Sequence, residues 1–253
     1  ICAERETDQI REARPPREES EHARGASSTC CSSDRVGLTA TAESNGANSA
    51  VNYTQYCGED RSVAKSSRKT SVHVLVTGCG GFLGSEIVRQ LIDRGDRVTG
   101  VSRGDYPDLV ARGMTHCQGD LTQADFVLHS VRDVDAVIHT AAVAGVWGPW
   151  EYFYSINKLA TDNVIEACRS NGISKLVFSS SPSVTFDGDH QRGVDESVPY
   201  ASQWLCHYPH TKALAEQAVL AAHEPGRLVT AALRPHLIWG EDDPHILPRM
   251  LDR

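Results

Sequence analysis

Residues 72–84 read Val72-His73-Val74-Leu75-Val76-Thr77-Gly78-Cys79-Gly80-Gly81-Phe82-Leu83-Gly84. The first six residues form a short β-branched run, which is typical of a strand buried in a parallel sheet. Glycines follow, and an amphipathic helical pattern begins at Phe82. A glycine turn between a strand and a helix lets backbone amides approach a pyrophosphate at the helix start. We therefore expect a dinucleotide site formed by Gly78, Gly81, Phe82, Leu83 and Gly84.

Strands and helices alternate along the rest of the chain from Ser71 onward. Further strands are expected at 97–102, about 114–118, 136–139, 175–181 and 228–233. Helices are expected at 82–94, about 123–132, about 152–171 and from the Tyr208 region to about 223. This alternation predicts the α/β class with a doubly wound, Rossmann-like parallel sheet. Ligands bind outside the carboxyl ends of the strands in such sheets, so the residues directly after the strands are the candidates for a site.

Three groups of residues after strands fit a bound dinucleotide. Arg103 follows the second strand, where an acidic residue for the ribose of NAD is missing; because arginine pairs with a 2′-phosphate, NADP is expected, with NAD left open. Asp120 and Leu121 follow the third strand, where the carboxylate can bind the adenine amino group or simply cap a turn. Ala141 and Ala142 follow the fourth strand, and their small side chains let the backbone approach a cofactor.

Tyr208 and Lys212 stand four residues apart on an expected helix, so they share one helical face. A phenol titrates near pH 10 in water and exchanges protons at neutral pH only when a nearby cation stabilises its phenolate. Ser179, Ser180 and Ser181 end the fifth strand, where a hydroxyl can donate to a substrate carbonyl while Tyr208 delivers the proton. In this order along the chain, the residues predict nicotinamide-dependent redox chemistry.

The first 70 residues differ from the rest in composition. They are rich in Arg, Glu, Ser, Ala and Asn and have almost no apolar periodicity. Such a stretch cannot bury enough surface to offset its ordering entropy. We therefore predict a disordered, low-complexity tail over 1–70 and one NAD(P)-binding domain over 71–253.

Charge and composition exclude several other classes of function. The net charge of -8 and the lack of a basic stripe argue against nucleic acid. No apolar run reaches the roughly 18 residues of a membrane span. The eight cysteines form no CxxC pair and the histidines no HExxH motif, so no metal is expected. A reduced, cytoplasmic setting fits this pattern.

Taken together, these motifs resemble those of the extended short-chain dehydrogenase/reductases, and more closely the 3β-hydroxysteroid dehydrogenase branch. Its bacterial members include sterol 4-carboxylate 3-dehydrogenases and 2-alkyl-3-oxoalkanoate reductases. The resemblance covers about residues 71–253. The segments that carry it are 77–84, 119–121, 141–148, 181–184 and 233–240, together with the Tyr208-x-x-x-Lys212 pair.

The resemblance implies a role for each of four side chains. Tyr208 would be the acid/base, Lys212 its activator, and Ser181 the hydroxyl that orients the carbonyl, with Ser180 as the alternative. Asn157 would support the lysine. Ala160 replaces a glycine that is usual in the family. Related enzymes continue well past Arg253, which implies that the region forming the substrate lid is largely missing.

The expected function is that of an NAD(P)-dependent oxidoreductase acting on CH–OH. It would interconvert a secondary alcohol and a ketone on a hydrophobic substrate, either sterol-like or a long-chain β-keto acid. One alternative is an epimerase or dehydratase of the nucleotide-sugar type, which would retain its cofactor through purification. The other is a dinucleotide-binding fragment without catalysis. The resemblance also implies a possible homodimer.

Overall fold

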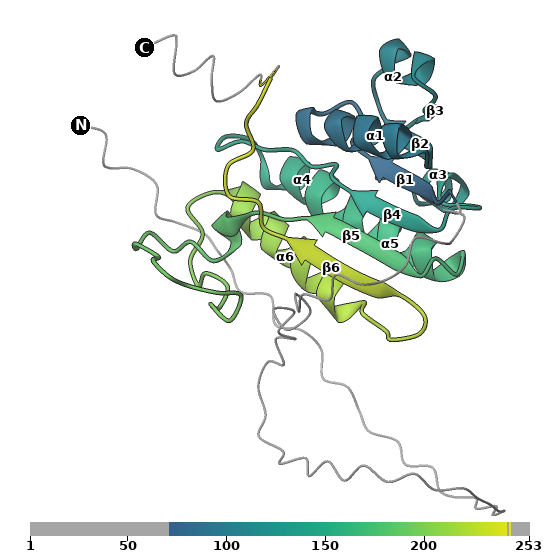
Figure 1. Cartoon of the computed structure of the whole chain (residues 1–253). Helices are drawn as coiled ribbons and strands as arrows, with labels where there is room; N and C mark the ends of the chain where they lie inside the picture. The colour runs from purple at the N-terminus through teal and green to yellow at the C-terminus, as the bar shows by residue number, and fades with distance from the viewer. Residues whose placement is uncertain (1–70, 242, 244–253) are drawn as a thin grey trace, which may run out of the picture. The chain divides into compact units, whose positions relative to one another are not determined.

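The sheet has six parallel strands, seen in a computed structural model that describes residues 71–241 and 243 (Figure 1). The predicted disordered tail lies outside the described residues. The order across the sheet is β3-β2-β1-β4-β5-β6. Their bounds are β1 His73–Thr77, β2 Arg97–Ser102, β3 Thr115–Gln118, β4 Ala136–His139, β5 Lys175–Ser179 and β6 Val229–Leu233. This is the strand order of dinucleotide-binding doubly wound sheets. From β1 to β3 the chain adds strands toward one edge of the sheet, and from β4 to β6 it adds them toward the other edge. The predicted fold class is confirmed.

Helices pack on both faces of the sheet (Figure 1). Side chains alternate along β1, so Val74 and Val76 pack with α1 and α2, whereas Leu75 packs in the larger core with α3, α5 and α6. The helical segments are α1 Phe82–Arg94, α2 Pro107–Ala111, α3 Ala124–Ser130, α4 Trp150–Phe153, a π-helical segment Tyr154–Leu159, α5 Ala160–Ser170, a 3-10 turn Pro182–Val184 and α6 His207–Ala221. None of the helices in the described part of the chain is long and apolar enough to cross a bilayer.

The structure differs from the sequence-based expectation in three elements. The fifth strand ends at Ser179 rather than at residue 181, because Ser181 caps a 3-10 turn that begins with Pro182. A short helix, α2, follows β2 and was not expected. The single helix expected at 152–171 begins at Trp150 and widens into π-helix over Tyr154–Leu159. Such widened turns occur often at functional sites, and this one contains Asn157.

Candidate active site

The glycine turn brings the start of α1 close to the ends of β1 and β4. Gly78 has φ +67, and a Cβ there would lie 2.8 Å from the Cα of Ala141. A Cβ at Gly84 would lie 2.1 Å from the carbonyl oxygen of Gly78. Both positions therefore need glycine if the backbone is to stay in place. Gly81 is the N-cap of α1, and no side chain caps it, so the first-turn amides are left for a ligand or water.

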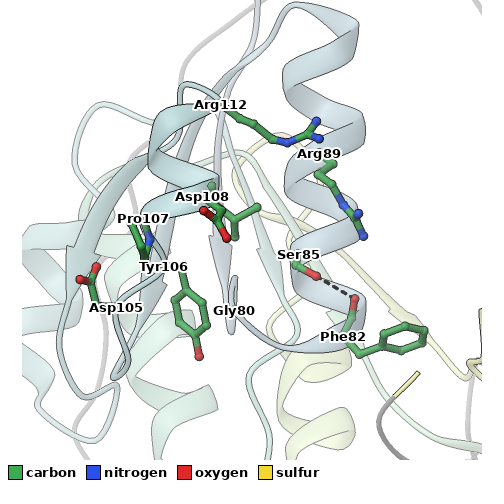
Figure 2. Close-up of a pocket in the computed structure, with 10 residues that line it drawn as sticks. Gly80, Phe82, Ser85, Arg89, Asp105, Tyr106, Pro107, Asp108 and Arg112 are labelled. Carbon is green, nitrogen blue, oxygen red and sulfur yellow. Dashed lines mark hydrogen bonds between the residues drawn. The ribbon is translucent and has the colours of Figure 1, made fainter. Parts of the chain in front are cut away.

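A cavity of about 660 Å³ lies between the glycine turn, α1 and the loop after β2 (Figure 2). The ring of Tyr106 packs so closely on Gly80 that any larger residue there would displace it. Arg89 and Arg112 line the same cavity from α1 and from the end of α2, and Arg89 forms an ion pair with Glu86. The full lining is Gly80, Phe82, Ser85, Arg89, Asp105, Tyr106, Pro107, Asp108, Leu109 and Arg112.

Sequence reasoning missed most of this cavity wall. Pro107 was the available signal, since proline is favoured in the first turn of a helix and marks the start of α2. Arg103, the residue expected to select NADP, is exposed in the same loop but does not line the cavity. Its carbonyl oxygen accepts a hydrogen bond from Gln118 Nε2 at 2.8 Å, which connects the loop to β3.

The residues after β3 and β4 have the following contacts. Asp120 Oδ1 accepts hydrogen bonds from the amide and the hydroxyl of Thr122 at 2.9 and 3.0 Å, so the aspartate forms the turn considered as its alternative role. Leu121 is buried in the larger core. Ala141 lies against Gly78, and its amide donates to Thr77 Oγ1 at 3.3 Å; Ala142 is exposed. The backbone after β4 thus lies beside the glycine turn.

Asn157 joins three parts of the molecule. Its Oδ1 accepts from the amide of Val143 at 2.8 Å, and its Nδ2 donates to the carbonyl of Val143 at 3.1 Å. The same Nδ2 donates to Thr211 Oγ1 at 3.0 Å, between Tyr208 and Lys212 on α6. Asn157 is 1% exposed. It therefore fixes α6 and the loop after β4 relative to the π-helical segment.

A buried chain of hydrogen bonds continues from Asn157 to the glycine turn. Thr161 Oγ1 donates to the carbonyl of Asn157, so it accepts from His139 Nε2 at 2.9 Å. The other ring nitrogen, Nδ1, is then the acceptor for Thr77 Oγ1 at 2.6 Å. Burial, together with the charge of Lys212, lowers the pKa of His139 to about 3. His139 is thus a neutral link between β1 and Asn157.

Asn157→Ala tests this framework. The change removes both side-chain partners of the partly buried Val143 backbone and one partner of the buried Thr211 hydroxyl. Leaving buried polar groups unpaired costs about 1–3 kcal/mol. We expect urea titration to show a loss of this size in the free energy of unfolding. Asn163→Ala is the matched control, since its side chain makes one hydrogen bond, to the carbonyl of Leu121. An equal or larger loss for Asn163→Ala would contradict the role given to Asn157.

Tyr208, Ser181 and Lys212 come together at the carboxyl end of β5. Burial raises the pKa of Tyr208, and a hydrogen-bond interaction with Ser181 opposes that rise. Lys212 is 2% exposed; its Nζ donates to the carbonyl of Ser179 at 2.6 Å and lies 3.9 Å from the centroid of the Phe178 ring. Burial lowers the pKa of Lys212 to about 7. The expected lowering of the Tyr208 pKa by Lys212 stays a prediction for the cofactor-bound site.

Ser180 and Ser181 have different surroundings. Ser180 is 5% exposed, and its hydroxyl donates to Glu216. Ser181 is half-buried, lies at hydrogen-bonding distance from Ser183 (2.8 Å between the hydroxyl oxygens) and interacts with Tyr208. The geometry therefore favours Ser181 as the hydroxyl beside the phenol. Sequence reasoning gave no sign of Glu216.

Aromatic rings surround the start of α6. His210 lies between two indoles: its ring centroid is 5.1 Å from that of Trp204, in a stacked arrangement, and 4.9 Å from that of Trp150. Trp147, which lies in the loop between β4 and α4, is 91% exposed. Trp150, the first residue of α4, therefore packs on the helix of Tyr208, while Trp147 is free to meet a ligand or another segment.

The sheet order, the glycine turn and the strand-end side chains define a Rossmann-like α/β protein of the short-chain dehydrogenase/reductase type. The model of the 3-beta hydroxysteroid dehydrogenase/isomerase family matches residues 75–252, and the chain belongs to that family. The predicted resemblance is confirmed.

Among curated proteins, a 2-alkyl-3-oxoalkanoate reductase of Shewanella oneidensis is 47% identical over 187 residues, covering 72% of this chain and 48% of its own. A decarboxylating sterol-4-alpha-carboxylate 3-dehydrogenase of Bos taurus is 36% identical and is matched over 49% of its length. The chain thus spans about half the length of these relatives. The solved structure of MoeE5 in complex with UDP-glucose and NAD is similar, with TM-score 0.56 and 33% identity over 64% of this chain and 53% of that one.

Proposed function

We propose that this chain binds a nicotinamide dinucleotide and takes part in interconverting a secondary alcohol and a ketone. The observation that carries the proposal is the meeting of Tyr208, Ser181 and Lys212 at the end of β5, on the edge of the sheet that holds the glycine turn. The names of the curated reductase and dehydrogenase relatives support the same reaction class. The test is whether the folded chain binds NADPH and reduces ketones in its presence.

The glycine turn fits the pyrophosphate of such a cofactor. Gly78 and Gly84 leave no room for a Cβ, and the uncapped amides at the start of α1 suit an anion. Phe82 and Leu83 would lie beside the pyrophosphate, and Ala141 and Ala142 along the cofactor. Asp120 and Leu121 would lie near its adenine. The bound nicotinamide would supply or accept the hydride.

The protein side chains would handle the proton and the carbonyl oxygen. Ser181 would donate a hydrogen bond to the carbonyl oxygen, and the Tyr208 hydroxyl would give its proton to that oxygen as the alcohol forms. Lys212 would stabilise the resulting phenolate as a nearby positive charge and hold the cofactor ribose. Asn157 would hold α6, which carries Tyr208 and Lys212, in place through its hydrogen bond to Thr211. Proton transfer of this kind contributes roughly 10²–10⁴-fold to a rate.

Arg103 is proposed to favour NADP over NAD. Its side chain is exposed at the end of β2, beside a cavity that is lined by Arg89 and Arg112 as well as by Asp105 and Asp108. Because a guanidinium pairs with a phosphate but gains little from a ribose hydroxyl, Arg103→Ala should weaken NADPH binding about tenfold or more and leave NADH binding nearly unchanged. Arg97→Ala, at the opposite end of β2, is the control. Equal losses for both cofactors would refute the role of Arg103.

The substrate is proposed to be hydrophobic, either a long-chain β-keto acid or a sterol. Large apolar side chains are exposed near the carboxyl ends of the strands, including Val146, Trp147, Leu205, Leu237 and Trp239. The relatives' names include both substrate types. A panel of 3-oxo acids and 3-oxosteroids of increasing chain length or ring size, with NADPH, distinguishes them. A homodimer stays a prediction from the family resemblance.

A second candidate is an epimerase that uses its nicotinamide transiently. This candidate is supported by the similar fold of MoeE5, whose structure was solved with UDP-glucose and NAD. An epimerase would carry dinucleotide through purification and would show no net change in reduced cofactor. Release of the bound nucleotide by denaturation, followed by chromatography, separates the two candidates.

A further inference from the structure

Glu216 is a buried carboxylate that the proposed mechanism does not use. It lies on α6 one turn after Lys212 and is 1% exposed. An ionised carboxylate in such a place is strongly unfavourable unless its oxygens are paired and hydrogen-bonded. Its surroundings therefore need to supply those partners.

Three segments supply them. Arg234, just after β6, donates from Nη2 to Oε1 at 2.5 Å and from Nε to Oε1 and Oε2 at 3.0 and 3.2 Å. Tyr200, from the loop before α6, donates its hydroxyl to Oε1 at 2.9 Å. Ser180 donates to Oε2. Both carboxylate oxygens are thus satisfied, and the carboxylate joins α6 to the ends of β5 and β6.

The network lies directly beside the proposed catalytic side chains. Ser180 precedes Ser181, and its amide donates to the carbonyl of Leu233 at 2.6 Å, so both its side chain and its backbone are held. Lys212 Nζ contacts the carbonyl oxygen of Ser179 and the ring of Phe178, and the side chain is too buried for water to stabilise its charge fully. Glu216 is the nearby negative charge that favours the protonated lysine.

We propose that Glu216 is a positioning residue of the active site. It would hold, through Ser180, the strand end that carries Ser181, and it would supply the negative charge that keeps the Lys212 ammonium protonated. The first role rests on the proposed function, whereas the effect on Lys212 can be measured without it.

The titratable and charged groups around Lys212 come from several elements, and any of them that carries a charge would also shift the pKa of Lys212. His139 of β4 is neutral at physiological pH, and the pKa of Tyr208 lies above its ordinary value. Burial and Glu216 raise the pKa of Tyr200 to about 12, so Tyr200 is also neutral. Glu216 and Arg234 therefore remain as the two charges that can be altered independently.

Two substitutions should move the pKa of Lys212 in opposite directions. Glu216→Gln removes the negative charge and leaves Arg234 unpaired, so the lysine should lose its proton at a pH about one unit lower than in the unaltered chain. Arg234→Met removes the positive charge and leaves the carboxylate, so the lysine should titrate about one unit higher. Glu166→Gln, which removes an exposed carboxylate on α5, is the matched control and should change nothing.

Heteronuclear NMR of the full chain labelled with ¹³C,¹⁵N-lysine measures this titration directly. The sequence has five lysines, Lys65, Lys69, Lys158, Lys175 and Lys212, so the spectrum is simple and Lys212→Arg assigns the signal. Circular dichroism checks that each variant is folded; if Glu216→Gln unfolds, Arg234→Met still decides the question. Opposite shifts support the proposal. An unmoved Lys212 titration in folded Arg234→Met, or shifts of the same sign, would overturn it.

An activity measurement then tests the positioning role. Ketone reduction with NADPH by Glu216→Gln should fall mainly in kcat, and its alkaline limb should move to lower pH together with the lysine titration. A loss of rate without that movement would show a merely structural role. If the unaltered chain binds neither NADPH nor NADH, the proposed function fails, while the NMR result still decides whether Glu216 controls Lys212.

Discussion

Tyr208→Phe is expected to reduce ketone turnover about 10²–10⁴-fold while leaving a folded protein that still binds NADPH. The substitution removes the phenol oxygen alone. In the structure that oxygen interacts with Ser181. Because phenylalanine keeps the ring, the packing of α6 should be retained when the hydroxyl is lost. Because the hydroxyl is proposed to act when the proton is transferred, the loss should fall on kcat rather than on KM.

The control for Tyr208→Phe is Tyr152→Phe, which removes a hydroxyl from a tyrosine that is 45% exposed on α4. We expect that variant to keep the unaltered rate. Steady-state rates with NADPH and the best ketone of the panel are compared for both variants, and cofactor binding is titrated separately. If Tyr208→Phe kept turnover within about threefold, proton delivery by Tyr208 would be refuted.

Gly84→Ala is expected to have the other large effect, on both stability and cofactor binding. The added Cβ would lie 2.1 Å from the backbone carbonyl of Gly78, and no flexible side chain can move out of its way. The start of α1 must therefore shift, at a cost of about 1–3 kcal/mol or more, and the uncapped amides of its first turn shift with it. Thermal unfolding should occur about 2–4 °C lower for each kcal/mol lost, and NADPH binding should weaken as well.

Gly95→Ala is the control that separates the cost of backbone strain from the cost of shifting the start of α1. Gly95 ends α1 with φ +91, but a Cβ there meets nothing within 4 Å. Its replacement should cost about 1–2 kcal/mol of backbone strain and leave the affinity for NADPH unchanged. The account of the glycine turn would be wrong if Gly84→Ala bound NADPH as tightly as Gly95→Ala does.

The sheet could be predicted from the sequence because its signals are local. A short β-branched run such as 72–77, followed directly by glycines, favours a buried strand, and the glycines at 78 and 84 can be recognised by their spacing. The alternation of strands with helices then leaves few topologies. The structure adds the physical reason for each glycine, since Gly78 packs on Ala141 and Gly84 on Gly78.

What the sequence did not reveal depends on contacts between distant segments. Glu216 and Arg234 look like ordinary surface charges until folding brings α6 and the end of β6 together. The choice between Ser180 and Ser181 likewise depends on Glu216, which binds only the first. Asp120 was predicted to bind the adenine, with a turn as its alternative role; its bonds to Thr122 form that turn, and its contact with the adenine stays a prediction. The cavity beside Tyr106 arises from a short helix whose five residues carry little periodic signal.

The most direct test of the central claim is a fluorescence titration of the folded 253-residue chain with NADPH and with NADH, followed in the same cuvette by addition of 3-oxo acids and 3-oxosteroids. We predict saturable binding that is tighter for NADPH and that Gly84→Ala weakens. Addition of a ketone should oxidise NADPH, and Tyr208→Phe should slow that oxidation about 10²–10⁴-fold. A chain that is folded by circular dichroism yet binds neither cofactor would contradict the central claim.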